Sequence, residues 1–292
     1  MKLLRSATLT VADLDAAIAR YRDYLDYAVV HEGEMSADLA AFLHAPRSEG
    51  ARYCVMQPAS GVEIYLRLVE QPSVAGYTPL TSYGWAAIEV CVQDVLAAHE
   101  RIKPSPFEVI GPPREIEGLP AIYPMQVKGP DGEIVYLTQI RDNLPAYDLP
   151  RATAPIDRLF ILVVGCSDMH ASLKWFDETL NFETGRVMEI EYHMLADAYG
   201  TPRNEMHTIA TGIHGRDVFL ELDQYPPAAT ARPKHAGMLD PGAALGSFLH
   251  PDFDTLKGWV SPPAARAEAP YNGKRAGILQ GPDGLLVEVV EL

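Results

Sequence analysis

Extended apolar runs that end at an Asp and lead into a helical pattern occur four times along the chain. Side chains of a strand alternate between two faces, whereas the apolar positions of a helix recur every three or four residues. An Asp suits a helix start because its carboxylate accepts hydrogen bonds from free backbone N–H groups. The four helices are expected to begin at Asp13, Asp94, Asp168 and Asp252.

Each helical pattern is followed by two more extended stretches and then by a Gly and a closing strand. In the third unit the two stretches are residues 186–195 and 204–214. The closing strands are expected within residues 61–68, 132–138, 215–222 and 284–290. The pattern predicts an α+β fold in which a strand–helix–strand–strand–strand module occurs four times.

The second half of the chain repeats the first. Residues 13–27 (DLDAAIARYRDYLDY) align with residues 168–182 (DMHASLKWFDETLNF), and the turn GPDG occurs at 129–132 and again at 281–284. Similarity at a fixed offset indicates duplication. Residues 141–155 hold three prolines and no helical or strand period, which is typical of a linker. We therefore expect an N-terminal module pair at 1–145, a linker at 146–155 and a C-terminal pair at 156–292.

Charge and composition limit the kinds of partner that we expect for this protein. The net charge of −15 repels phosphate backbones and anionic lipid heads, so we expect neither nucleic-acid nor membrane binding. The chain has no apolar run long enough to span a bilayer and no secretory signal. Its three widely spaced cysteines indicate buried thiols of a reducing cytoplasm rather than a disulfide framework. A small-molecule substrate or ligand is the expected partner, with the protein acting as a monomer or a homodimer.

The segments TLTVADLDAAIARYRDYL and GPDGLLVEVVEL resemble the vicinal oxygen chelate superfamily, which includes glyoxalase I, bleomycin-resistance proteins and extradiol dioxygenases. The resemblance covers almost the whole chain. It implies that βαβββ modules pair into U-shaped, mostly antiparallel sheets, each of which cups a ligand. Four modules imply two such cups, one in each half of the chain.

The same resemblance points to the positions that hold a metal ion in metal-dependent members. Those members take one ligand from each closing strand, usually Glu, and one from each opening strand, usually His. The closing-strand positions here are Arg67, Tyr136, Glu221 and Glu288, and the opening-strand positions are Ser6, Ala87, Arg158 and Leu245. None of the opening positions is His, which makes a poor zinc or iron site.

We expect the second cup to be the working one, because Glu221 and Glu288 keep the carboxylate positions. Glu288 would move a proton while Arg158 stabilises an oxyanion, with Glu221 or His207 as the second acid or base. Glu288, Glu221 and His207 holding a divalent ion (Mg, Mn, Fe or Zn) is a variant of this hypothesis. Phe219 and Phe160 are expected to line the substrate site.

The first cup is expected to hold Tyr65, Arg67 and Tyr136. Aromatic faces with a few polar groups suit a flat or amphipathic small molecule, and they equally suit the filling of an inactive cup.

The leading hypothesis is an enzyme, a lyase or an isomerase, that acts on a small and partly apolar or aromatic molecule. The alternative is a metal-free binding protein that sequesters its ligand, as bleomycin-resistance proteins do. Extradiol ring cleavage is less favoured because it needs two imidazole ligands for iron.

Overall fold

The computed structural model describes residues 2–292, and its elements follow the predicted four modules. Module one consists of β1 (Leu4–Val11), α1 (Leu14–Leu25), β2 (Tyr27–Glu34), α2 (Ala37–Phe42), η1 (Pro46–Ser48), β3 (Arg52–Pro58) and β4 (Tyr65–Glu70). Module two consists of β5 (Gly84–Val92), α3 (Val95–Ile102), β6 (Glu108–Gly111), β7 (Ile122–Lys128) and β8 (Ile134–Ile140). Module three consists of β9 (Ile156–Cys166), α4 (Met169–Leu180), β10 (Glu183–Glu191), α5 (His193–Tyr199), β11 (Met206–His214) and β12 (Asp217–Gln224). Module four consists of β13 (Ala243–His250), η2 (Phe253–Thr255), β14 (Ser261–Ala265), β15 (Arg275–Gln280), η3 (Pro282–Gly284) and β16 (Leu286–Glu291).

Three of the four predicted helix starts are confirmed. The carboxylates of Asp13, Asp94 and Asp168 accept hydrogen bonds from backbone N–H groups two or three residues ahead. The fourth prediction is wrong, because Asp252 precedes only the single 3₁₀ turn η2 and makes no side-chain cap. Gly258, with φ of +81°, and the prolines that follow leave too few residues there for a helix.

Two short helices were not predicted. Both α2 and α5 lie between the second and third strands of an odd-numbered module. The stretch 186–195 was expected to be extended throughout, but the chain turns at Tyr192 and His193 begins α5.

The sixteen strands form two eight-stranded sheets, and each sheet combines modules from both halves of the chain. One sheet has the order β14-β15-β16-β13-β1-β4-β3-β2, and the other has the order β10-β11-β12-β9-β5-β8-β7-β6. The two-cup fold is therefore confirmed, but the predicted pairing within each half is wrong. Modules one and four share the sheet that we call the outer cup, and modules two and three share the inner cup.

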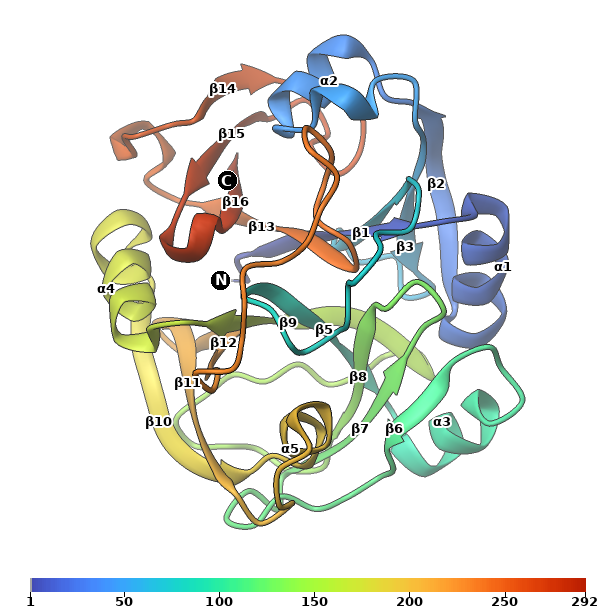
Figure 1. Ribbon diagram of the computed structural model, residues 1–292, viewed down its shortest axis with the longest axis vertical. Coiled ribbons are helices and arrows are strands. Elements are labelled where there is room, and N and C mark those ends of the chain that lie inside the picture. Colours follow the sequence, from blue (N-terminus) through green and yellow to red (C-terminus); the bar gives the residue numbers. More distant parts are fainter. Residues whose placement is uncertain (1) are drawn as a thin grey trace.

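Antiparallel pairing of the opening strands makes this arrangement. β1 pairs with β13, and β5 pairs with β9. The four opening strands repeat one sequence pattern. This pattern alone does not determine which two opening strands pair with each other. In Figure 1 the outer cup occupies the upper half of the molecule and the inner cup the lower half.

The sheets are held together by a shared apolar core and by the repeated turns. Trp85 of the inner cup packs against Phe248 of the outer cup at 6.1 Å between ring centroids, and its Nε1 donates to the carbonyl of Leu286 at 2.8 Å. Asp131 of the first GPDG turn accepts from the backbone N–H of Ala12 at 2.8 Å. Asp283 of the second turn accepts from Ser167 in the same way at 2.9 Å. Each turn therefore links its own sheet to the start of a helix whose module belongs to the other sheet.

Each cup is closed by one of the two inserted helices, which lie over opposite ends of the molecule in Figure 1. Leu39, Leu43 and Phe42 of the α2 region are buried in the apolar interior of the outer cup. Met194 and Leu195 of α5 are buried in the same way in the inner cup. Both cups are thus lined by strands and covered by a helix.

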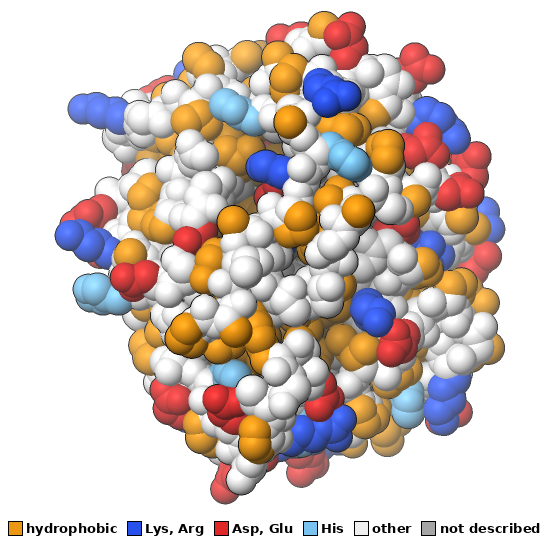
Figure 2. Space-filling model, viewed as in Figure 1, with side chains coloured by type: hydrophobic (Ala, Val, Ile, Leu, Met, Phe, Trp, Pro, Cys, Tyr) orange, Lys and Arg blue, Asp and Glu red, His pale blue; other side chains and the backbone are white. Residues whose placement is uncertain are grey.

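Acidic and basic side chains are interspersed around the edge of the face shown in Figure 2. Among residues 2–292, no helix is long and apolar enough to cross a membrane.

Candidate functional site

A buried cluster of Glu288, Arg67 and Tyr271 lies in the outer cup. The phenol of Tyr271 donates to Oε1 of Glu288 at 2.7 Å, and Nη2 of Arg67 donates to the Tyr271 oxygen at 2.8 Å. The same Nη2 lies 3.3 and 3.4 Å from the two carboxylate oxygens. Glu288 is 0% exposed, and Arg67 and Tyr271 are 1% exposed. Charged groups this deeply buried need such partners.

Strand register places these groups together. Arg67 on β4 lies beside Thr8 of β1. Glu288 on β16 lies beside Ser247 of β13, which in turn pairs with Ser6. Four strands from the first and last modules therefore deliver Arg67, Glu288 and three hydroxyl groups to one face.

Several donors of this face have no partner within the described residues. They are Nη1 of Arg67 and the hydroxyl groups of Ser6 and Ser247, all buried. A buried donor without an acceptor costs free energy, so these donors are candidates for hydrogen bonds to a ligand or to water. Burial lowers the pKa of Arg67, but the nearby Glu288 and Tyr271 outweigh this effect and the net pKa is raised, so the guanidinium stays charged. Burial raises the pKa of Tyr271, which keeps the phenol protonated.

Aromatic side chains form the wall of the outer cup. Phe42 of α2 meets Tyr271 edge to face at 6.2 Å. Tyr65 accepts a hydrogen bond from Nδ2 of Asn272 at 3.2 Å. The guanidinium of Arg266 stacks on Phe42 at 3.8 Å, and its Nη1 donates to Asp38 at 2.9 Å. Arg266 therefore fastens α2 over the cup.

The inner cup has a different chemistry, with two buried carboxyl groups and a third that is partly buried. Glu89 lies on β5, and Glu221 and Asp223 lie on β12. The hydroxyl of Thr138 donates to Glu89 at 2.5 Å, and the phenol of Tyr192 donates to Glu221 at 3.4 Å. Tyr136 and Tyr192 are joined through their hydroxyl groups.

Burial raises the pKa of each of these carboxyl groups. The pKa of Glu89 rises to about 8, with the charge of Glu221 as a further cause. Burial likewise raises the pKa of Asp223 to about 8. The pKa of Glu221 lies well above its ordinary value because of burial and the neighbouring Asp223. A set of carboxyl groups that crowd one another holds protons at neutral pH.

The structure does not bring the predicted catalytic residues together. Glu288 is in the outer cup, whereas Glu221 and His207 belong to the inner cup, so the expected C-terminal cup does not exist. Arg158 lies at the start of β9, next to Asp157 at 3.9 Å, five residues before the partner of Glu221 along that strand. The oxyanion role expected of Arg158 therefore has no place beside Glu288.

The predicted lining residues divide in the same way. Tyr65 and Arg67 line the outer cup, and Tyr136 and Phe160 line the inner cup. Phe219 faces neither cup. A register shift opposite Gly212 and Ile213 turns it into the core, where its ring lies 4.7 Å from that of Phe182. A bulge of this kind reverses the alternation that a sequence pattern assumes.

The residues at the family's metal positions do not fit a metal ion. The outer cup offers Ser6, Arg67, Leu245 and Glu288, so a guanidinium stands where a second carboxylate is needed. The inner cup offers Ala87, Tyr136 and Glu221. The strand register places Val163, not the predicted Arg158, between Ala87 and Glu221. Over residues 2–292, no group of three or more His, Cys, Asp or Glu side chains is placed to hold a metal ion.

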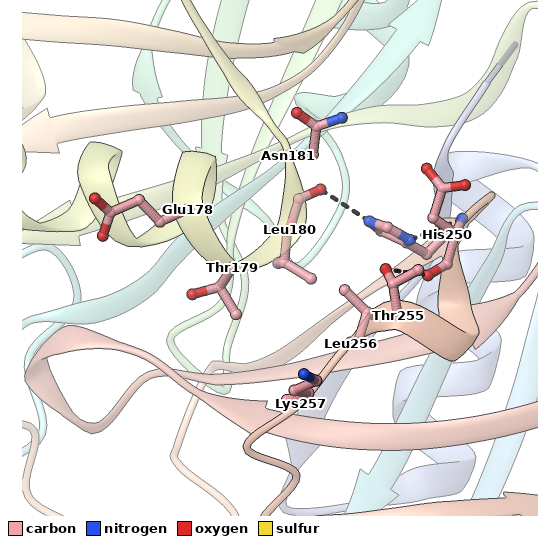
Figure 3. Close-up of a pocket in the computed structure, with 9 residues that line it drawn as sticks. Glu178, Thr179, Leu180, Asn181, His250, Thr255, Leu256 and Lys257 are labelled. Carbon is pink, nitrogen blue, oxygen red and sulfur yellow. Dashed lines mark hydrogen bonds between the residues drawn. The ribbon is translucent and has the colours of Figure 1, made fainter.

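A groove of about 530 Å³ lies outside the cups, between the end of α4 and η2 (Figure 3). His250 is the histidine that lines this groove. Its Nδ1 accepts from the backbone N–H of Asp252 at 3.2 Å, and its Nε2 lies 2.8 Å from the carbonyl of Leu180. Both ring nitrogens are occupied, which makes His250 a structural residue, as its position before Pro251 suggests.

Sequence reasoning missed Tyr271, Tyr192 and Asp223 as site residues. Tyr271 lies in the loop between β14 and β15, and Tyr192 precedes α5, so neither follows a strand period. Asp223 was predictable from the sequence. It lies two residues after Glu221 on the same strand, and side chains two residues apart share a face.

The fold and the two cups define a protein of four paired βαβββ modules. Residues 3–136 match the model of the Glyoxalase/Bleomycin resistance protein/Dioxygenase superfamily. This match covers module one and most of module two, and it is the match that the sequence resemblance predicts.

Solved structures agree with this fold. Glyoxalase I from Zea mays is 17% identical, with 100% of this chain and 92% of that chain covered and a TM-score of 0.62. A putative dioxygenase from Bacillus subtilis is 10% identical, with 99% and 86% covered and a TM-score of 0.62. Likenesses at these identities show the fold alone. Among curated proteins, none matches the sequence.

Proposed function

We propose that the protein is an enzyme that moves a proton on a small, partly apolar organic molecule in the outer cup, as an isomerase or a lyase. The observation that supports this most is the buried Arg67–Tyr271–Glu288 cluster with its unpaired donors. A carboxylate beside a fixed cation is suited to taking a proton from carbon while negative charge develops on a neighbouring oxygen.

In this proposal Glu288 is the base and Arg67 serves the oxygen. As the C–H bond breaks, its electrons move toward the oxygen, which Nη1 of Arg67 and the hydroxyl groups of Ser6 and Ser247 would stabilise. Tyr271 holds the carboxylate of Glu288 in place through its hydrogen bond. Return of the proton to another carbon gives an isomerase, and loss of a leaving group gives a lyase.

Entry to the outer cup requires α2 to move, because its apolar side chains fill the interior. Closure afterwards would exclude water and strengthen the charge interactions around the substrate. No step runs through a metal ion, because Arg67 occupies a ligand position.

A metal-free binding protein is the second candidate. The apolar, helix-covered interiors of the cups favour it, since such an interior, once its helix moves, would hold an apolar ligand without reacting with it. It predicts that an unaltered ligand is recovered after denaturation of the purified protein.

The test is exchange of carbon-bound hydrogen in D₂O with a panel of aromatic and aliphatic ketones and 2-oxo acids, followed by mass spectrometry. After treatment with a chelator, the protein is expected to catalyse exchange of at least one of these compounds. The substitution Glu288→Gln should lower the rate by about 10²- to 10⁴-fold, the usual range for a general base.

The matched control is Glu291→Gln, the same change three residues along β16 at a partly exposed position. This variant should exchange at the unaltered rate. Exchange that survives Glu288→Gln would contradict the assignment, and activity lost on chelation would contradict the metal-free route.

A further inference from the structure

The inner cup brings together carboxyl groups on which, within residues 2–292, no Lys or Arg acts. Glu221 and Asp223 lie two residues apart on β12, beside Val163 and Gly165 of β9, and Glu89 lies on β5 at the other side of β9, beside Ile161. Asp223 is only 1% exposed. Over the described residues, neither carboxylate oxygen of Asp223 has a hydrogen-bond partner. Buried carboxyl groups normally have a basic partner or a ligand.

Two further polar side chains face this cluster without partners of their own. Tyr225 lies two residues beyond Asp223, is 2% exposed, and its hydroxyl is unpaired among residues 2–292. The ring of Tyr225 lies against Gly165, the residue of β9 that pairs with Asp223. Burial raises the pKa of Tyr225, and the charge of Asp223 raises it further. Nε2 of His207, on the neighbouring strand β11, is buried and has no partner in the described chain.

Among residues 2–292, no Lys or Arg contributes to the pKa shifts of these three carboxyl groups. Tyr136 of β8 and Tyr192 before α5 are neutral phenols, because burial raises their pKa values. Tyr199 of α5 is another phenol whose pKa is raised by burial. Arg232 lowers the pKa of Tyr225, but its guanidinium donates to Ser82 and to the carbonyl groups of Pro241 and Ala243.

The walls of the inner cup are aromatic and apolar. Phe160, Tyr136, Tyr192 and Tyr225 belong to its buried interior together with Ile161 and Val163. An ammonium group is attracted both to carboxylates and to the faces of aromatic rings. A bare metal ion would need at least three converging ligands, and these carboxyl groups are not so arranged within residues 2–292.

We propose that the inner cup binds a small organic cation, with Asp223 and Glu221 as its counter-charges and the rings of Tyr136, Tyr192 and Tyr225 as its walls. This second site is separate from the proton-transfer site of the outer cup and takes the opposite charge. α5 covers it and must move for the cation to enter.

Binding of a cation is linked to the release of protons. The carboxyl groups of Glu89 and Asp223 have pKa values of about 8 and are mostly protonated at pH 7. A bound ammonium group lowers these pKa values, so protons leave as the cation enters. Affinity should therefore rise between about pH 6 and pH 8.

The test is calorimetric titration of the full chain with benzylammonium and tetramethylammonium, with benzyl alcohol as the neutral probe. At pH 8 the cations are expected to bind and the alcohol is not. At pH 7, titrations in buffers of different ionisation enthalpy should show release of protons on binding. Equal binding of benzyl alcohol, or binding of neither cation, would overturn the proposal.

Asp223→Asn and Glu221→Gln keep the shape of each side chain and remove its charge, and each should weaken cation binding at least tenfold. Glu288→Gln, in the outer cup, should leave it unchanged, and thermal unfolding of each variant checks that it is folded. Unchanged affinity in both inner-cup variants would overturn the proposal. Loss of proton transfer in Glu288→Gln with cation binding intact would separate the two sites.

Discussion

Arg67 places a buried positive charge in the outer cup, beside the carboxylate of Glu288. It stands on a closing strand at a position where metal-dependent relatives carry a carboxylate, and its guanidinium lies against the remaining carboxylate of Glu288. The guanidinium stays charged beside this carboxylate, and within residues 2–292 its Nη1 has no hydrogen-bond partner. In the proposed reaction, this guanidinium would stabilise the developing oxyanion.

Glu89 is predicted to make the protein less stable as the pH rises. Its pKa is raised from 4.5 to about 8 in the folded protein, so the folded state binds more protons than the unfolded state between these values. The contribution of this group is therefore present below about pH 4.5 and is lost as the pH rises through 8. Glu89→Gln stays neutral at every pH, so it should remove this pH dependence and unfold at higher urea than the natural protein at pH 9.

At pH 4 the same variant should gain nothing, because Glu89 is then protonated in both states. Urea denaturation at pH 4, 7 and 9 measures the difference. Thr138→Val is the companion variant, since it removes the hydroxyl that donates to Glu89. A Glu89→Gln protein whose pH dependence matches the natural one would contradict the assignment.

Single residues of the site were partly predictable. The position of Glu288 follows from the GPDG turn, whose final Gly284 has φ of +76° and sets the start of β16. Its partners were not predictable, because Tyr271 comes from a loop and Arg67 from a distant module. Contacts between far segments depend on sheet order, which local patterns do not contain.

The helix α2 is the element that controls access to the outer cup. Its six residues are too few to be stable alone, so its place depends on tertiary contacts. Stacking of Arg266 on Phe42 and the hydrogen bond from Ser261 to the carbonyl of Phe42, at 2.6 Å, supply two of them.

Arg266→Ala is predicted to loosen α2 without unfolding the sheet. A stacked Arg contributes roughly 0.5–2 kcal/mol, which corresponds to a several-fold rise in local opening. Amide hydrogen exchange of residues 37–43 should become several-fold faster, while β1 exchanges as before. Arg275→Ala is the control, because this side chain stacks on Phe253 at 5.2 Å away from α2. Unchanged exchange in residues 37–43 would show that Arg266 does not hold the helix.

Element types were well predicted where a repeat supported them and less well elsewhere. Helix caps at Asp13, Asp94 and Asp168 have a direct chemical signal. α2 and α5 have none, because each is too short to show a clear period. Phe219 was misplaced because the bulge in β12 depends on its pairing with β11.

At the scale of the molecule, each cup needs strands from both halves of the chain. The fragments 1–145 and 156–292 would each contain one module of the outer cup and one of the inner cup. The boundaries of the two halves, at residues 145 and 156, remain a proposal. The sheet order nevertheless predicts how separate halves would fold.

Expressed separately, the two fragments are predicted not to fold into stable sheets, because in each fragment two opening strands lack their antiparallel partners and the apolar core is exposed. Mixed together, they should restore both sheets. Circular dichroism and size-exclusion chromatography of each fragment and of the mixture provide the measurement. Cooperative unfolding of either fragment alone would contradict this prediction, and residues 84–225, which contain the whole inner sheet, serve as the comparison.

The pairing of β1 with β13 also sets an order of events on the ribosome. All strands of the inner cup have been synthesised before β13 emerges, so β1 waits with a free edge while most of the chain is made. A free edge of this kind accepts any matching strand. When two nascent chains are close, β13 of one can pair with β1 of the other, and exchange of module four between copies is the natural misassembly of this fold.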